Sequence, residues 1–131
     1  MSWVTPRDDS LGAQLRPGVE IVMEAVGLEA SVRDADLVIT GEGRIDSQTV
    51  HGKTPVGVAR MAKRFGKPVI GIAGCLSSDV AVVHDFGIDA VFSVLSQAGS
   101  VEEALTNAAA NVRAASRNIA AALKLARGMQ P

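Results

Sequence analysis

The stretch that most constrains this chain is residues 36–53, DLVITGEGRIDSQTVHGK. It opens with an apolar and β-branched run from Leu37 to Thr40, which then gives way to glycines and charged side chains. A short apolar run bounded by glycines is typical of a strand buried on both faces of a parallel sheet. Open α/β sheets bind their ligands beyond the carboxyl ends of the strands. We therefore expect the charged residues after Thr40 to form a loop at the functional edge of a sheet.

Hydrophobic periodicity predicts that helices and strands alternate along the chain. Helices are expected over residues 17–27, 28–35, 54–66, 77–87 and 100–127, and strands over 36–40, 68–74 and 88–95. This order predicts the α/β class, with a three-layer, mostly parallel, Rossmann- or flavodoxin-like sheet. Because three strands are few for such a sheet, we expect a partial domain whose sheet is extended from elsewhere.

Size and charge narrow the possible partners. A chain of 131 residues fits one domain, in which residues 1–10 show no periodicity and are predicted to be a loose leader rather than a signal peptide. The net charge of −1 gives no reason to expect a nucleic acid partner. No apolar stretch approaches the roughly 18 residues needed to span a membrane. The single cysteine, Cys75, excludes an intrachain disulfide and favours a cytoplasmic location.

The C-terminal third is predicted to be one unbroken amphipathic helix. It starts at a capping box formed by Ser100 and Glu103, and its stripe of small residues should let it lie close against a neighbour. Aromatic residues make up only 3% of the chain, yet the mean hydropathy is positive at +0.23. Such a surplus of apolar residues indicates surface that another polypeptide covers, so we expect a homo-oligomer or a companion segment.

The segment after the first strand carries the candidate chemistry. Backbone N–H groups of Gly41 and Gly43, together with the guanidinium of Arg44, could hold an anion. The carboxylates of Glu42 and Asp46 could hold Mg²⁺ or act on a substrate hydroxyl. The alternative is a turn with a solvated salt bridge.

A second candidate lies at the start of the next helix, in the sequence His51-Gly52-Lys53-Thr54. A phosphate-binding P-loop is excluded because that motif needs glycine at position 47, where the chain has Ser47. Lys53 could still meet a phosphate at the helix N-terminus, although a solvated loop lysine is an equal alternative.

Three further polar residues are interpreted as structural. Cys75 is expected to be a small packed residue, because no obvious base accompanies it. His84 has no metal-ligand partner one helical turn away and is expected at the surface. Asp79 is explained by the dipole of the helix that it begins.

Several of these segments together resemble the C-terminal part of the bacterial glycerate kinases of the type-1 family. The resemblance rests on DADLVITGEGRIDSQTVHGKTPVGVA, KPVIGIAG and GIDAVFSVL, and it extends over roughly residues 11–125. It implies two α/β domains with the active site in the cleft between them, and phosphoryl transfer from ATP to D-glycerate with Mg²⁺. Full members of the family are much longer, and this chain lacks their N-terminal part.

By this resemblance, residues 11–131 are the C-terminal part of a glycerate kinase α/β domain. Glu42, Arg44 and Asp46 would be catalytic, and Gln48 and Lys53, with the two glycines of the GEG sequence, would bind substrate or phosphate. The metal ligands are left unassigned. The activity of this chain alone is then in question, and one half of a split kinase or a non-catalytic module that binds an anion or self-associates are the alternatives.

Overall fold

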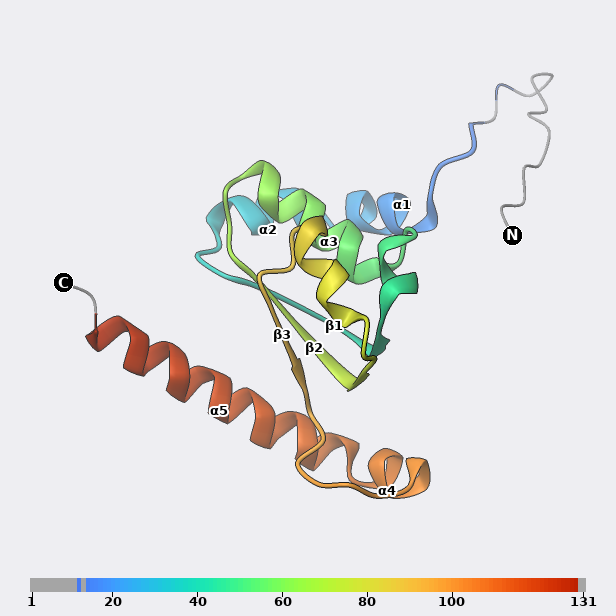
Figure 1. Cartoon of the computed structure of the whole chain (residues 1–131). Helices are drawn as coiled ribbons and strands as arrows, with labels where there is room; N and C mark the ends of the chain where they lie inside the picture. Colours follow the sequence, from blue (N-terminus) through green and yellow to red (C-terminus); the bar gives the residue numbers. More distant parts are fainter. Residues whose placement is uncertain (1–11, 13, 130–131) are drawn as a thin grey trace.

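The computed structural model describes residues 12 and 14–129, so the predicted leader lies outside the described residues. Its centre is a parallel sheet of three strands in the order β1-β2-β3, formed by β1 (Val38–Ile45), β2 (Val69–Leu76) and β3 (Ala90–Ser93) (Figure 1). Both pairings are parallel, with Val38 opposite Val69 and Ile70 opposite Ala90. The predicted α/β class is confirmed.

One face of the sheet is covered by the first helices. These are α1 (Gly18–Ala25), α2 (Leu28–Asp34), α3 (Thr54–Arg64) and the 3-10 helix η3 (Val80–Phe86) (Figure 1). The predicted helix at residues 77–87 is therefore shorter and more tightly wound than expected. The aliphatic core lies between this layer and the sheet, and its buried members are Val32, Val38, Ile45, Val56, Ala59, Ala62, Val69, Ala73, Val83 and Ile88.

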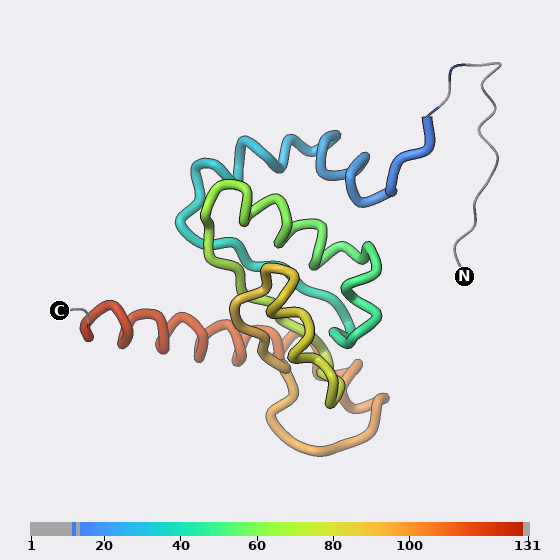
Figure 2. Tube along the Cα trace, turned by 45° about the horizontal axis from the view of Figure 1, so that its top comes forward, coloured from blue at the N-terminus to red at the C-terminus, as the bar shows by residue number. Residues whose placement is uncertain are grey.

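The opposite face is only partly covered. The predicted long helix is two helices, α4 (Val101–Thr106) and α5 (Ala108–Gly128), separated at Asn107, whose φ of −96° and ψ of 9° leave the helical region. A short polar side chain such as asparagine favours this kind of interruption. In Figures 1 and 2, α5 runs on the side of the sheet opposite α1–α3. Ile119 is the buried residue of α5 in the described structure, so the close packing predicted for its small residues is not made against the described part of this chain.

Strand β1 differs from its predicted form in two ways. It continues to Ile45 instead of ending at Thr40, and it is not buried on both faces, since Ile39 is 52% exposed. Side chains alternate between the two faces of a strand. Val38 therefore enters the core while Ile39 lies on the face that α5 leaves open.

The described part of the chain contains no helix that is long and apolar enough to cross a membrane.

Candidate functional site

The charged segment predicted as a loop is the end of strand β1. Backbone pairing with β2 continues through Arg44 opposite Cys75 and Ile45 opposite Leu76. Ile45 is fully buried in the core, and this burial fixes the strand end despite the two preceding glycines, which disfavour strand structure. The candidate residues nevertheless lie at the carboxyl end of a parallel strand, as expected from the sequence.

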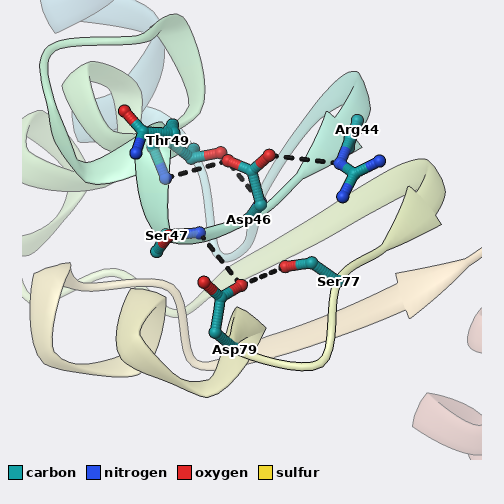
Figure 3. A network of polar contacts seen from close by, with 7 residues as sticks. Arg44, Asp46, Ser47, Thr49, Ser77 and Asp79 are labelled. Carbon is teal, nitrogen blue, oxygen red and sulfur yellow. Dashed lines mark hydrogen bonds and ion pairs between the residues drawn. The ribbon is translucent and has the colours of Figure 1, made fainter.

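Asp46 organises the turn that follows. Its carboxylate accepts a hydrogen bond from the Gln48 N–H at 2.9 Å, while the Thr49 hydroxyl accepts one from the Asp46 N–H at 3.1 Å (Figure 3). This reciprocal capping box starts the 3-10 helix η2 (Ser47–Val50). Thr49 is fully buried, so the turn is anchored to the protein interior.

Arg44 and Asp46 form the salt bridge that was the structural alternative for this segment. The Arg44 Nε lies 3.1 Å from the Asp46 Oδ2, with the Arg44 side chain 63% exposed and that of Asp46 17% exposed. An exposed pair of this kind contributes little to stability, about 0–1 kcal/mol. In Figure 3 the other guanidinium nitrogens of Arg44 make no hydrogen bond to the residues drawn and point away from Asp46. The salt bridge therefore holds an arginine fork in place without using all its donors.

Glu42 carries the one unsatisfied buried side-chain oxygen among the described residues. Its Oε2 is inaccessible to solvent and has no hydrogen-bond partner. The residue pairs in register with Ala73, which is buried in the core. A buried carboxylate oxygen without a partner is costly, and a ligand, a cation or an ordered water could satisfy it.

The carboxylates at the end of β1 could bind Mg²⁺ only if the substrate supplied further ligands. Among the described residues, no group of three acidic, histidine or cysteine side chains could hold a metal ion. Mg²⁺, however, is commonly bound by one or two carboxylates together with substrate phosphates and water. The unpartnered oxygen of Glu42 suits such a shared site, whereas both carboxylate oxygens of Asp46 are already engaged by Arg44 and by Gln48.

The two glycines of β1 differ in their surroundings. A Cβ atom on Gly41 would lie 2.9 Å from the Ile72 carbonyl oxygen, so a side chain is excluded there. Nothing lies within 4 Å of the equivalent position on Gly43. Both glycines border a cavity of about 670 Å³ between the open face of the sheet and the start of the α4–α5 segment. Exposed backbone at Gly43 can therefore be approached closely from this side.

Gln48 and Lys53 are positioned differently from the charged residues of β1. Gln48 is exposed in η2 and joins the network only through its N–H. Lys53 is the exposed N-cap of α3, and no side chain caps this helix; Pro55 has no N–H, so Thr54 and Val56 supply the uncapped N–H groups of its first turn. The structure thus brings Arg44, Asp46 and Gln48 into one network. Lys53 lies outside this network and follows η2 in the sequence.

Asp79 makes a contact that the helix dipole did not predict. Its Oδ1 accepts hydrogen bonds from the Ser47 N–H at 3.4 Å and from the Ser77 hydroxyl (Figure 3). The side chain of Ser47 first and that of Ser77 second lower the pKa of Asp79 from its ordinary value, and the Ser47 N–H adds a smaller effect in the same direction, so the carboxylate is ionised at neutral pH. The helix dipole gave no signal of this, because Ser47 lies 32 positions away in the sequence.

Cys75 and His84 take no part in the network. Cys75 is a half-buried free thiol on β2. The His84 Nδ1 lies 2.7 Å from the Ile88 carbonyl oxygen, at the end of η3. The histidine therefore connects η3 to the segment that leads into β3, at the surface position expected for it.

Comparison with known proteins identifies the family. The profile of the glycerate kinase family matches residues 9–124. This chain belongs to the glycerate kinase family. It is 60% identical over 115 residues to glycerate 2-kinase of Escherichia coli K12, and 56% identical over 119 residues to glycerate kinase of Bacillus subtilis 168. These alignments cover 88% and 91% of this chain, but only 30% and 31% of the respective relatives.

A solved structure agrees with this assignment. The crystal structure of a glycerate kinase 2 from Salmonella typhimurium LT2 superposes with a TM-score of 0.69 at 58% identity, covering 90% of this chain and 30% of that one. The chain therefore spans about 30% of the length of the glycerate kinases that it matches. The GEGRIDSQT segment lies inside the matched region.

Proposed function

We propose that this chain forms one wall of an active site that transfers a phosphoryl group from ATP to D-glycerate. The observation that carries the proposal is the end of β1, where an arginine fork and a buried, unpartnered Glu42 oxygen lie beside two glycines. Phosphoryl transfer requires mainly positioning and charge neutralisation, which such a set of residues can supply. Membership in the glycerate kinase family supports this choice of substrates.

The cationic and glycine residues would bind the anionic groups of the substrates. Arg44 is held by Asp46 and retains donors for a phosphate or for the carboxylate of glycerate. Lys53 and the uncapped start of α3 would meet a second anionic group. Gly43, with free space around its Cα, allows phosphate oxygens to approach the backbone.

Glu42 would hold Mg²⁺, with ATP phosphates and water completing the coordination. The ion neutralises phosphate charge when it is bound. Asp46 keeps the turn and Arg44 in position, and Gln48 would contact the substrate from the exposed side of η2.

The site needs a second wall. The chain spans about 30% of the length of its relatives, and we infer that the remaining wall is formed by residues equivalent to the rest of a glycerate kinase. We place this site in the cytoplasm because the chain has a single cysteine. The open sheet face would receive it, since Ile39 is 52%, Leu95 40% and Phe92 38% exposed in the described structure. A second copy of the chain is the alternative occupant, which would make this protein a self-associating module.

Reconstitution tests the proposed function. The chain alone, and the chain mixed with a separate polypeptide comprising the rest of the Escherichia coli glycerate 2-kinase, are assayed for ATP-dependent phosphorylation of D-glycerate. We expect activity in the mixture, and phosphate on the 2-hydroxyl, as the name of that relative implies. In the mixture, Glu42→Gln should lower kcat by about a hundredfold or more, if it acts on transition-state charge.

The matched control for this replacement is Glu102→Gln, which removes an exposed carboxylate on α4 and should leave the rate unchanged. If the wild-type mixture forms a complex that is inactive with D-glycerate, the kinase proposal is wrong. A stable dimer of this chain that excludes the companion would instead favour the self-associating module.

A further inference from the structure

Two segments that are distant in sequence meet beside the candidate site. The turn after β1, helix η2, packs against helix η3, which follows β2. Asp79, immediately before η3, accepts the N–H of Ser47, the first residue of η2. Among the described residues, no other side-chain hydrogen bond joins η2 to a distant part of the chain.

A second hydrogen bond holds the Asp79 carboxylate in the orientation that accepts the Ser47 N–H. The Ser77 hydroxyl donates to the same carboxylate oxygen and so fixes the rotamer of Asp79 (Figure 3). The Ser77 N–H in turn donates to the Ile45 carbonyl oxygen at 3.2 Å, which ties the end of β2 to the end of β1. Asp79 is therefore held by Ser77, whose own backbone is hydrogen-bonded to the end of β1, where the candidate site lies.

The bond between Asp79 and Ser47 also affects the position of the candidate residues Arg44 and Gln48. Ser47 follows Asp46 directly, and Asp46 holds both the Arg44 guanidinium and the Gln48 N–H. A displacement of Ser47 would move these groups together, because the capping box couples them to one short turn. At 3.4 Å the bond from the Ser47 N–H is long, and the charge of the Asp79 carboxylate strengthens it.

We propose that Asp79 is a positioning residue that fixes the Asp46–Gln48 turn relative to Arg44 at the end of β1. The functional part of this inference rests on the proposed kinase function. Asp79 touches no substrate itself and acts through Ser47. The lowered pKa of Asp79 agrees with a carboxylate that accepts these bonds throughout the neutral range.

Amide hydrogen exchange in this chain tests the positioning directly. Asp79→Ala should speed exchange at the Ser47 amide about tenfold or more and shift the amide resonances of Ser47 and Gln48. Asp79→Asn keeps an acceptor oxygen and should restore part of the protection. The matched control is Asp85→Ala, which removes an exposed carboxylate from η3 and should leave these amides unchanged.

Kinase assays of the same variants in the reconstituted mixture test whether the position of this turn affects catalysis. Asp79→Ala should lower kcat/KM for D-glycerate about tenfold, with Asp79→Asn intermediate and Asp85→Ala unchanged. Unmoved Ser47 and Gln48 amides in Asp79→Ala, or moved amides with unchanged kcat/KM, would overturn the positioning role. If the wild-type mixture has no activity, the kinase proposal fails by itself, and the amide exchange still decides whether Asp79 fixes the turn.

Discussion

The carbonyl oxygen of Gly43 lies 2.6 Å from the position that a Cβ atom on Gly74 would occupy. The two glycines lie between the paired residues of β1 and β2, with Glu42 opposite Ala73 on one side and Arg44 opposite Cys75 on the other. The strand that carries the candidate site is thus in contact with its neighbour at a point where no side chain fits. Gly43 itself faces free space, so the two glycines serve different purposes.

Replacing each glycine by alanine separates these purposes. Gly74→Ala should destabilise the protein by about 1–3 kcal/mol, because the added methyl group forces β1 and β2 apart. Gly43→Ala should change the free energy of unfolding by less than about 1 kcal/mol, yet lower the activity of the reconstituted mixture if phosphate approaches the backbone there. Urea denaturation and the kinase assay measure both effects. Equal stability loss in the two variants would contradict the assignment.

Thr49 should protect the Asp46 amide through its hydroxyl. Thr49→Val keeps the shape of the buried side chain but removes the acceptor, which should cost about 1–2 kcal/mol and expose the Asp46 N–H to exchange. Thr49→Ser, the matched control, retains the hydroxyl and should retain the protection, although it loses a buried methyl group. Hydrogen exchange read at Asp46 distinguishes the two variants, and fast exchange in both would exclude the capping box.

A second carboxylate should make stability depend on pH in the acidic range. The ammonium of Lys63, 2.5 Å from the Asp89 carboxylate, holds the pKa of Asp89 below its ordinary value of 3.8; partial burial opposes this effect, and the Val69 N–H at 2.7 Å adds to it. Because the pKa is lowered on folding, the stabilisation is present above about pH 3.8 and is lost as the pH falls through the folded-state pKa.

Asp89→Asn should therefore lose about 1 kcal/mol at neutral pH, a small value because both side chains are well exposed. The difference from wild type should stay constant above about pH 4 and shrink below it. Thermal unfolding measured from pH 2.5 to 7 gives this profile. Asp85→Asn, which removes an exposed carboxylate without an ion pair in the described structure, should show no comparable step; a difference that persists unchanged at the lowest pH would rule out the linkage.

Local sequence signals predicted most of the fold and part of the site. The alternation of helices and strands, and the capping box of Ser100 and Glu103, follow from spacing and local chemistry alone, and the structure confirms them. The end of β1 was misplaced because Gly41 and Gly43 resemble turn residues. What extends the strand is non-local, namely pairing with β2 and burial of Ile45.

The remaining misses have the same origin. Whether a stripe of small residues packs closely depends on the neighbour it meets, and α5 meets little of the described chain apart from Ile119. The bond between Asp79 and Ser47 joins two strand ends that only the folded sheet brings together. Candidate residues can therefore be found from a motif, whereas the residues that position them depend on tertiary contacts.

The open face of the sheet should be needed for association and not for folding. Ile39 and Phe92 lie on that face on the two strands that flank β2, 52% and 38% exposed, and each is paired with a β2 residue, Ile70 and Ile72 respectively. Replacing both by threonine keeps strand-favouring chemistry, so the free energy of unfolding of the isolated chain should change by less than about 1 kcal/mol.

Binding of the companion polypeptide, or of a second copy, should instead weaken about tenfold or more, because central apolar residues dominate such interfaces. Sedimentation velocity of the chain alone and with the companion measures this. Val26→Thr is the matched control, since this residue is 67% exposed but lies at the end of α1, across the sheet from the open face. If the double variant associates as tightly as wild type while Val26→Thr does not, the interface lies on the helical side of the sheet.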